Sequence, residues 1–311
     1  MSTLTKKKGK HIRWGRVITA YIMLLPGLLY LLINNYLPMY GITIAFRQLD
    51  FKKGILKSPF CGFKNFKFLF ASGSLGPIMR NTILYNLVFM VLGTIFAIAV
   101  AILFNELQNK AAKKFYQTSI LFPYLMSMVV VSSLVFNFLS ADSGFINNSI
   151  IEPLTGNTIS FYQEKKWWPF ILTIVHLWKG IGFSMVLYLS TILGISKDYY
   201  EAARVDGATK WQQITNITLP LLKPMVITMS ILNISKICTS DFGLFYQVPR
   251  NSGAIYSVTQ TLDTYVYNAL MNQNNISMSS AASVMQAFIG FVLVIGSNMI
   301  IRRISAEDAI F

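Results

Sequence analysis

The chain has 311 residues, of which 54% are hydrophobic and only 13% are charged. Soluble domains carry about a quarter charged residues, so this composition argues against a soluble protein with an oily core. The apolar residues also gather in runs long enough to cross a bilayer, which takes about 20 residues of helix. A net charge of +15 would suggest nucleic-acid binding in a soluble protein. In a membrane protein the same excess mostly reflects lysines and arginines that flank the spans, so we expect no nucleic acid as partner.

Six apolar segments predict an all-α membrane protein with six transmembrane helices. In chain order they are Val17–Ile33, with apolar residues continuing through Pro38 to Phe46, then Asn81–Phe104, Thr118–Leu139, Trp167–Leu193, Pro224–Phe245 and Ala281–Ile301. The first segment is too long for the apolar part of a signal peptide, and no small-residue cleavage site follows it. We interpret it as an uncleaved anchor.

The basic residues predict that both termini face the cytoplasm. The leading tail carries Lys6, Lys7, Lys8, Lys10, Arg13 and Arg16. Cytoplasmic flanks are enriched in lysine and arginine, and six spans return the chain to the side on which it starts. The segments expected outside are Asn34–Asn81 and Asp241–Ser280, and those expected inside are Asn105–Tyr116 and Ser196–Lys223. The rule is not obeyed cleanly, because seven lysines and arginines from Arg47 to Arg80 fall in the first outer loop.

The polar stretch between the fourth and fifth spans predicts two short helices joined at a glycine. Ser196 can cap the first helix through its side-chain oxygen. Gly207 stands where that helix would end, and glycine takes the left-handed conformation at low cost. Thr209 and Gln212 have the spacing of a capping box, which predicts the start of the second helix.

The far end of this stretch predicts a break before the fifth span. Leu219-Pro220 is expected to stop the second helix, and Pro224 is expected to open the span. The resulting amphipathic element suits a groove on another protein. The alternative is a helix that lies on lipid, but such helices favour polar faces rich in lysine and arginine, whereas charges of both signs occur here.

The same stretch resembles a family signature. Glu201-Ala202-Ala203, then Gly207, then Ile217-x-Leu219-Pro220 resemble the EAA signature of permease subunits in type I ATP-binding-cassette importers. Ile214 departs from it, because an aromatic residue often stands there. Stretches that resemble the carbohydrate-uptake (maltose-type) branch are Leu25–Gly27, Tyr36–Gly41, Phe60–Phe66, Asn81-Thr82 and Thr264–Tyr267. The stretch YGITIAF and the compact outer loops are most similar to the lipo-oligosaccharide and complex-glycan permease subgroup.

The resemblance implies a type I importer permease fold with a cytoplasmic EAA coupling loop at residues 196–223. Residues 1–80 would form the N-terminal cytoplasmic tail, first transmembrane helix and outer loop, and residues 81–311 a permease core of five transmembrane helices. The residues that would couple this chain to the ATPase are Glu201, Ala202, Ala203, Asp206, Gly207, Leu219 and Pro220.

The resemblance also implies partners and a substrate class. The chain would be one half of a heterodimeric permease in a bacterial cell membrane, with two copies of an ATPase subunit and an extracytoplasmic solute-binding protein. The sequence contains no G-x-x-x-x-G-K-[ST] phosphate loop, so ATP and Mg²⁺ are expected on the ATPase subunits and no cofactor on this chain. The expected substrate is an oligosaccharide or glycan. The alternatives are a non-sugar solute of the same importer class, or a secondary transporter, although no internal repeat is evident.

Two lysines inside predicted spans mark a candidate substrate path, because ionisable groups in a membrane usually face a pathway or a partner. The residues predicted to line the path are Trp178, Lys179, Tyr188, Asn233, Lys236 and Ser240. The last three recur at helical spacing and so could share one polar stripe. The alternative is that the lysines contact the partner subunit or reach outward, and that Trp178 simply packs.

Nothing in the sequence is typical of an active site. His11 and His176 are the only histidines and lie far apart. Cys238 lies inside an apolar segment, so neither a disulfide with Cys61 nor a cysteine metal site is expected. The acidic residues fall in loops or near span ends, with Asp241 closest to an exception. We therefore do not expect an enzyme.

Overall fold

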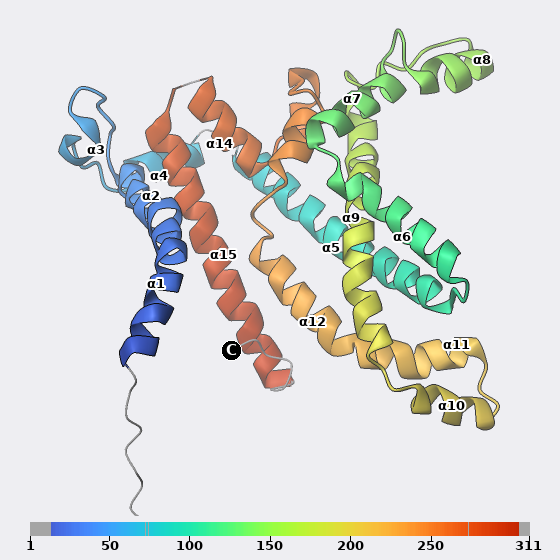
Figure 1. Ribbon diagram of the computed structural model, residues 1–311. Coiled ribbons are helices and arrows are strands. Elements are labelled where there is room, and N and C mark those ends of the chain that lie inside the picture. The colour runs from blue at the N-terminus through green and yellow to red at the C-terminus, as the bar shows by residue number, and fades with distance from the viewer. Residues whose placement is uncertain (1–13, 72, 74, 273, 305–311) are drawn as a thin grey trace, which may run out of the picture.

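The computed structural model describes residues 14–71, 73, 75–272 and 274–304, and this part of the chain is almost entirely helical (Figure 1). Its one β-bridge within the described residues joins Arg47 to Phe60. The tail residues from which we predicted the orientation, Lys6 to Arg13, lie outside the described residues. Both cysteines are free, as predicted.

Five of the predicted spans correspond to helices that are long and apolar enough to cross a membrane within the described residues. The first joins α1 (Trp14–Leu31), the π-helical turn η1 (Leu32–Tyr36), α2 (Leu37–Met39) and the 3-10 helix η2 (Tyr40–Phe46). The others are α5 (Leu75–Glu106), η4 with α9 (Lys165–Trp167, Trp168–Leu193), α11 with η5 and α12 (Lys210–Gln213, Ile214–Thr218, Leu219–Ser235), and α15 (Ile276–Ile304).

The third predicted span is a broken helix. Thr118–Leu139 was expected to be continuous, but α6 (Lys110–Leu125) and α7 (Met128–Leu139) meet at 97°. Pro123 lacks the backbone N–H that the last turn of α6 would use. Met126 is extended, and Ser127 caps α7 by accepting a hydrogen bond from the Val130 N–H at 3.4 Å. A proline followed by a capping serine is therefore the local cause of the break.

The predicted helix stop at Leu219-Pro220 is wrong, because one helical segment runs from Lys210 to Ser235. A proline clashes with the carbonyl four residues before it in an ordinary α-helix. Here η5 widens the turn just before the proline, since the Leu219 N–H bonds to the Ile214 oxygen five residues back. The fifth span then ends at Ser235, ten residues before the predicted Phe245, so Lys236 and Ser240 do not share a helical stripe with Asn233.

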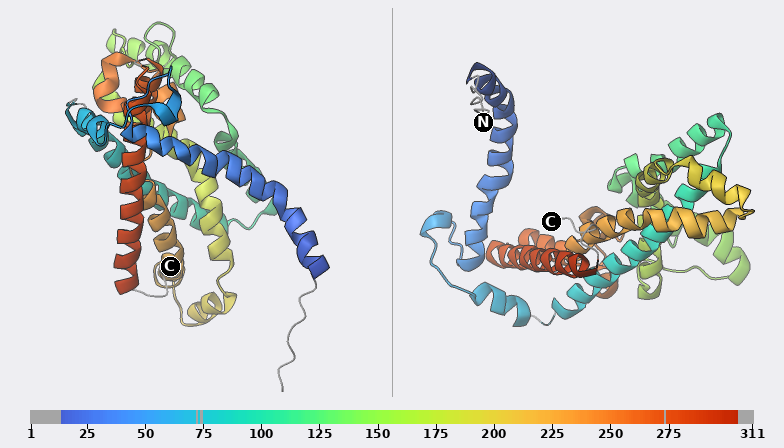
Figure 2. Two further views of the ribbon diagram at one scale, coloured as in Figure 1. Left: turned by 90° about the vertical axis from the view of Figure 1, so that its left-hand side faces the viewer. Right: turned by 90° about the horizontal axis from the view of Figure 1, so that it is seen from below.

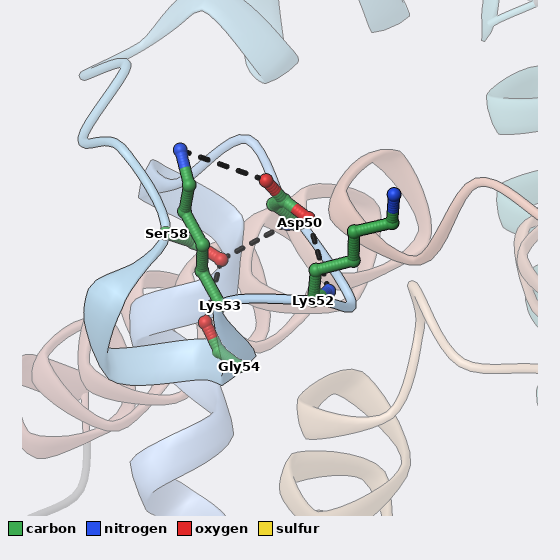
Figure 3. Close-up of polar contacts among 5 residues, drawn as sticks. All are labelled: Asp50, Lys52, Lys53, Gly54 and Ser58. Carbon is green, nitrogen blue, oxygen red and sulfur yellow. Dashed lines mark hydrogen bonds and ion pairs between the residues drawn. The ribbon is translucent and has the colours of Figure 1, made fainter.

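Within the first span, α1 stands away from the other helices (Figure 2), whereas η2 packs against α15. None of the residues in the most apolar 18-residue window of this span is buried. The loop that follows it holds α3 (Gly54–Lys57) and α4 (Lys64–Ala71). Figure 3 shows how Asp50 organises this loop: its Oδ2 lies 3.7 Å from Lys53 Nζ, and its backbone N–H donates to Ser58 Oγ at 3.0 Å. Ser58 in turn donates to the Gly54 oxygen at 2.6 Å.

The remaining elements are short and lie mostly at one end of the molecule. They are η3 (Asn147–Ile151), α8 (Glu152–Thr155), α10 (Lys197–Val205), η6 (Gly243–Gln247), η7 (Gly253–Ile255), α13 (Tyr256–Thr259) and α14 (Leu262–Met271). Figure 1 shows α10 and α11 at one end, with α3, α8 and α14 at the opposite end. The spans connect these two ends.

The core is built where α5 packs along α9. Ala97 and Ala101 of α5 are fully buried, beside Met185 and Leu189 of α9. Small residues at a helix interface let the backbones approach closely, which favours packing where lipid supplies no hydrophobic drive. Gly182 plays this part between α9 and α6, because a methyl group there would collide with the Ile120 carbonyl.

Gly182→Ala should lower the thermal unfolding midpoint of the purified protein, because the added methyl forces α6 away from α9. Overpacking of this kind costs about 1–3 kcal/mol. Gly180→Ala is the matched control, since a side-chain carbon at that position meets nothing within 4 Å. It should leave the midpoint unchanged or raise it slightly, because alanine favours helix. Equal midpoints for the two variants would contradict this account of the packing.

Candidate functional site

The loop between α9 and α11 has the local structure that its sequence predicts. Ser196 caps α10, accepting a hydrogen bond from the Asp198 N–H at 3.3 Å. Gly207 ends it with φ +78°, which confirms the predicted left-handed glycine. The N–H groups of Gly207 and Ala208 donate to Arg204 and Ala203, at 3.1 and 2.8 Å. This pattern is a Schellman motif and satisfies the last carbonyls of α10.

The second helix of the loop starts at the predicted capping box. The Thr209 N–H donates to Gln212 Oε1 at 2.7 Å, and the Gln212 N–H donates to Thr209 Oγ1 at 3.3 Å. Gln213 is buried and donates to the Ala208 oxygen at 3.0 Å, which closes the turn from inside. The glycine and both caps therefore hold α10 and α11 as one unit, which we call the α10–α11 knob (residues 196–213).

Two contacts fix the knob to the spans, and sequence reasoning missed both. Lys210 Nζ lies 2.7 Å from Glu106 Oε2, at the end of α5. The hydroxyls of Tyr200 and Thr218 lie 2.9 Å apart, which joins α10 to η5. In each contact the two residues are well separated in the sequence, so the contact becomes visible only in the three-dimensional structure.

The knob projects its surface away from the spans. Of the predicted coupling residues, Glu201, Ala202, Asp206 and Gly207 are exposed. Two large apolar side chains accompany them, Val205 at 88% exposed and Trp211 at 72%. Leu219 and Pro220 lie at the base of the knob, as the first two residues of α12. Carboxylates beside exposed apolar groups on a rigid element form a surface suited to a protein groove.

A cavity of about 560 Å³ lies between α5, α9 and α12, and we call it the central cavity. Of the predicted path residues, Tyr188, Asn233, Lys236 and Ser240 line it. Asn86, Thr94, His176, Ser184 and Asp241 add further polar groups to the wall. Asn86 and Thr94 were not singled out from the sequence, although their polar side chains stand out in a very apolar helix.

One wall of the central cavity is non-helical backbone, the stretch from Lys236 to Asp241. Side chains from three helices hold it. Asn86 donates to the oxygens of Ile237 and Thr239 at 2.9 and 2.8 Å. Gln286 of α15 donates to the Cys238 oxygen at 2.8 Å, and the Asp263 carboxylate of α14 accepts from Ser240 Oγ at 2.8 Å and from its backbone N–H. Irregular backbone at membrane depth is tolerated where protein buries it or where it lines a water-filled cavity.

Lys179 and Trp178 do not line the central cavity. His176 and Gly180 on the same helix do line it. Because each residue is rotated by about 100° around the helix axis, Trp178 and Lys179 lie on a different face of α9. Lys179 Nζ donates to three carbonyls at the end of α6: Pro123 at 3.3 Å, Tyr124 at 2.8 Å and Met126 at 2.7 Å. Trp178 is 45% exposed on the outside of α9. The lysine thus supplies a cation and donors where the broken helix leaves carbonyls without partners.

Lys179→Met should destabilise the fold by about 1–3 kcal/mol, because it leaves acceptors at the α6–α7 break without their donor. The measurement is the thermal unfolding midpoint in detergent. Lys236→Met is the matched control, since among the described residues Lys236 Nζ makes neither a hydrogen bond nor an ion pair. Its midpoint should stay at the wild-type value. If the Lys179→Met protein is as stable as wild type, Lys179 does not stabilise the α6–α7 break.

Comparisons with known proteins agree with this architecture. The profile of the family described as binding-protein-dependent transport system inner membrane component matches residues 91–306. Protein LplB of Bacillus subtilis (strain 168) is 32% identical over 99% of both chains. The polygalacturonan/rhamnogalacturonan transport system permease protein YteP of the same organism is 34% identical over 92% of this chain and 88% of its own.

A solved structure has the same fold. One chain of the bacterial alginate ABC transporter, crystallised with an alginate pentasaccharide-bound periplasmic protein, superposes with a TM-score of 0.83 at 30% identity. The match covers 94% of this chain and 96% of that chain. The predicted all-α membrane architecture is therefore that of an importer permease.

Proposed function

Because this chain belongs to the family of binding-protein-dependent transport system inner membrane components, we propose that it is one permease subunit of an ATP-driven carbohydrate importer. The observation that carries the proposal is the exposed, rigid α10–α11 knob. The relatives supply the substrate class, since YteP is named for polygalacturonan and rhamnogalacturonan and the solved neighbour for alginate. An oligosaccharide or glycan is the solute that we propose.

The knob is the coupling element of this proposal. Glu201 and Asp206 offer carboxylates, and Val205 and Trp211 offer apolar surface, to a groove on an ATPase subunit. A charge-assisted hydrogen bond to Glu201 would fix the orientation of the knob. The Lys210–Glu106 ion pair and the continuous helix to Ser235 give movement of the knob a direct route to the spans.

The remaining parts of the importer lie on other chains. We propose a second permease subunit, two copies of an ATPase subunit that bind ATP and Mg²⁺, and an extracytoplasmic solute-binding protein. The periplasmic protein bound in the alginate transporter structure supports the last of these. This chain then contributes half of the translocation path and no catalytic group.

The central cavity is the proposed share of that path. Its hydroxyl and amide side chains, with the ring of Tyr188, suit the hydroxyls and faces of sugar rings. The non-helical wall from Lys236 to Asp241 supports the proposal, because such backbone fits a hydrated lumen better than a lipid contact. Trp178 and Lys179 are not part of this proposed path, since they lie off the cavity wall.

We also propose that the knob faces the cytoplasm and that both termini lie on the same side, in a bacterial cell membrane. The basic leading tail supports this orientation. The end of the molecule with α3, α8 and α14 is then outside (Figure 1).

Gly207→Val should abolish transport while leaving membrane insertion intact. Valine at φ +78° costs on the order of 1–2 kcal/mol and changes the angle between α10 and α11, whereas position 207 itself lies outside every span. The purified complex should lose bound ATPase or hydrolyse ATP without regard to solute. Glu201→Ala removes one side chain without changing the backbone, so its effect should be smaller. A Gly207→Val complex that retains ATPase and transports normally would make a lipid-bound knob the better interpretation.

Cysteine labelling tests the orientation. In a background with Cys61→Ser and Cys238→Ser, an impermeant thiol reagent added to intact cells should not modify Lys210→Cys. It should modify Lys57→Cys, which lies in the exposed loop at the opposite end. Permeabilising the cells should make Lys210→Cys reactive, which controls for accessibility. Labelling of Lys210→Cys in intact cells would reverse the orientation.

A further inference from the structure

A second hollow lies at the end of the molecule opposite the knob. Its volume is about 570 Å³, and its walls come from α7 and from the chain around η6. Exposed polar groups line it, among them Ser133, Asn137 and Arg250. We call it the Arg250 hollow. In the proposed orientation it opens on the side from which solute arrives.

The guanidinium of Arg250 lies over an aromatic ring. Its guanidinium carbon lies 4.1 Å from the centre of the Phe136 ring. This contact is a cation–π interaction, and the guanidinium N–H groups make no hydrogen bond to the described residues, so they can donate to a ligand. Gln247 and Asn137 also line the hollow, and their amide groups can form hydrogen bonds with the hydroxyl groups of a ligand.

The backbone at this point is strained. Arg250 and the next residue, Asn251, have φ values of 54° and 49°, a conformation that side chains other than glycine adopt at a cost. Several contacts hold the turn. The Asn251 N–H donates to the Tyr246 oxygen at 3.1 Å, and Tyr256 donates to Asn251 Oδ1 at 2.8 Å. The guanidinium of Arg250 is thus positioned by an unfavourable backbone conformation. Strain of this kind is concentrated at functional positions.

Among the described residues, no carboxylate forms an ion pair with Arg250. The ion pairs of the described residues are Lys53–Asp50, Lys166–Glu164 and Lys210–Glu106. Tyr162 is a nearby titratable group, and burial raises its pKa to about 12 against the opposing effect of the Arg250 charge. A phenol is neutral at physiological pH, so Tyr162 forms no ion pair with Arg250.

We propose that the Arg250 hollow binds the carboxylate of an acidic sugar, so that the imported glycan contains uronate residues. This inference rests on the proposed importer function and names its substrate class. A guanidinium matches a carboxylate with two parallel hydrogen bonds, and the contact with the Phe136 ring restricts the movement of this one. The neighbouring amide and hydroxyl side chains can accept and donate to the ring hydroxyls of the same sugar.

Lys236 gives the same chemistry deeper in the molecule. It lies on the wall of the central cavity with no ion-pair partner among the described residues. Asp241 shares that wall, and the Leu244 N–H donates to its Oδ1 at 3.1 Å, which fixes the position of one carboxylate oxygen and leaves its negative charge in place. A uronate glycan passing from the Arg250 hollow to the central cavity would exchange one cation for another.

The test measures binding of tetragalacturonate and tetramannuronate to the assembled complex in nanodiscs, each against its fully methyl-esterified form. Esterification keeps the sugar and removes only the carboxylate charge. The acidic form of at least one tetramer should bind about ten- to a hundred-fold more tightly than its ester, with the difference shrinking as salt rises. Arg250→Gln should lower the affinity for that acidic form to the level of the ester and leave ester binding unchanged. Arg250→Lys should retain only part of the wild-type affinity for the acidic form, because lysine keeps the charge and lacks the planar guanidinium.

Lys57→Gln is the matched control, because it removes an exposed positive charge at the same end of the molecule, away from the hollow. It should leave the preference for the acidic form intact. Lys236→Gln should lower the uptake rate of the acidic form relative to neutral glycan. Equal affinity for acid and ester, equal effects of Arg250→Gln and Lys57→Gln, or no binding of any tetramer would overturn the inference. ATP-driven uptake of a neutral glycan alongside any of these results would keep the importer function and reject only its acidic substrate.

Discussion

The structure depends on how it satisfies backbone polar groups where helices stop inside a membrane. Lipid offers no hydrogen bonds, so every N–H and C=O that leaves a helix needs a partner from the protein or from a water-filled cavity. Two such places within the described residues are the break between α6 and α7 and the end of α12 at Ser235. Lys179 supplies donors at the first break, and Asn86 and Gln286 supply them at the second.

These two breaks also separate side chains that look alike in the sequence. Lys179 and Lys236 both lie in apolar stretches. Lys179 donates to three carbonyls, whereas Lys236 lines the central cavity and its Nζ bonds to none of the described residues. The difference arises from what packs beside each lysine. A structural lysine closes a break, whereas a lysine on a cavity wall is available to a solute, so the two cannot be assigned the same role.

The parts of the fold that could be predicted are those with local causes. The Gly207 end of α10 and the Thr209–Gln212 capping box depend on residues within a few positions of each other, and both are present as expected. The break in the third span has a local cause in Pro123 and Ser127, but its partner Lys179 is more than fifty positions away. The widened turn before Pro220 was missed because proline alone predicts a stop, and nothing in the sequence spacing indicates a π-helical turn that relieves the clash.

The continuous helix from Lys210 to Ser235 changes how the knob and the cavity relate. A stop at Pro220 would have left the knob on a hinge, so that movement there could be absorbed before it reached the spans. Instead the helix begins at the ion pair with Glu106 and ends next to Lys236, on the wall of the central cavity. Helices resist bending because each turn is hydrogen-bonded to the next. In the proposed importer, a partner that displaced the knob would therefore move the cavity wall with it, and the non-helical stretch after Ser235 would take up that displacement.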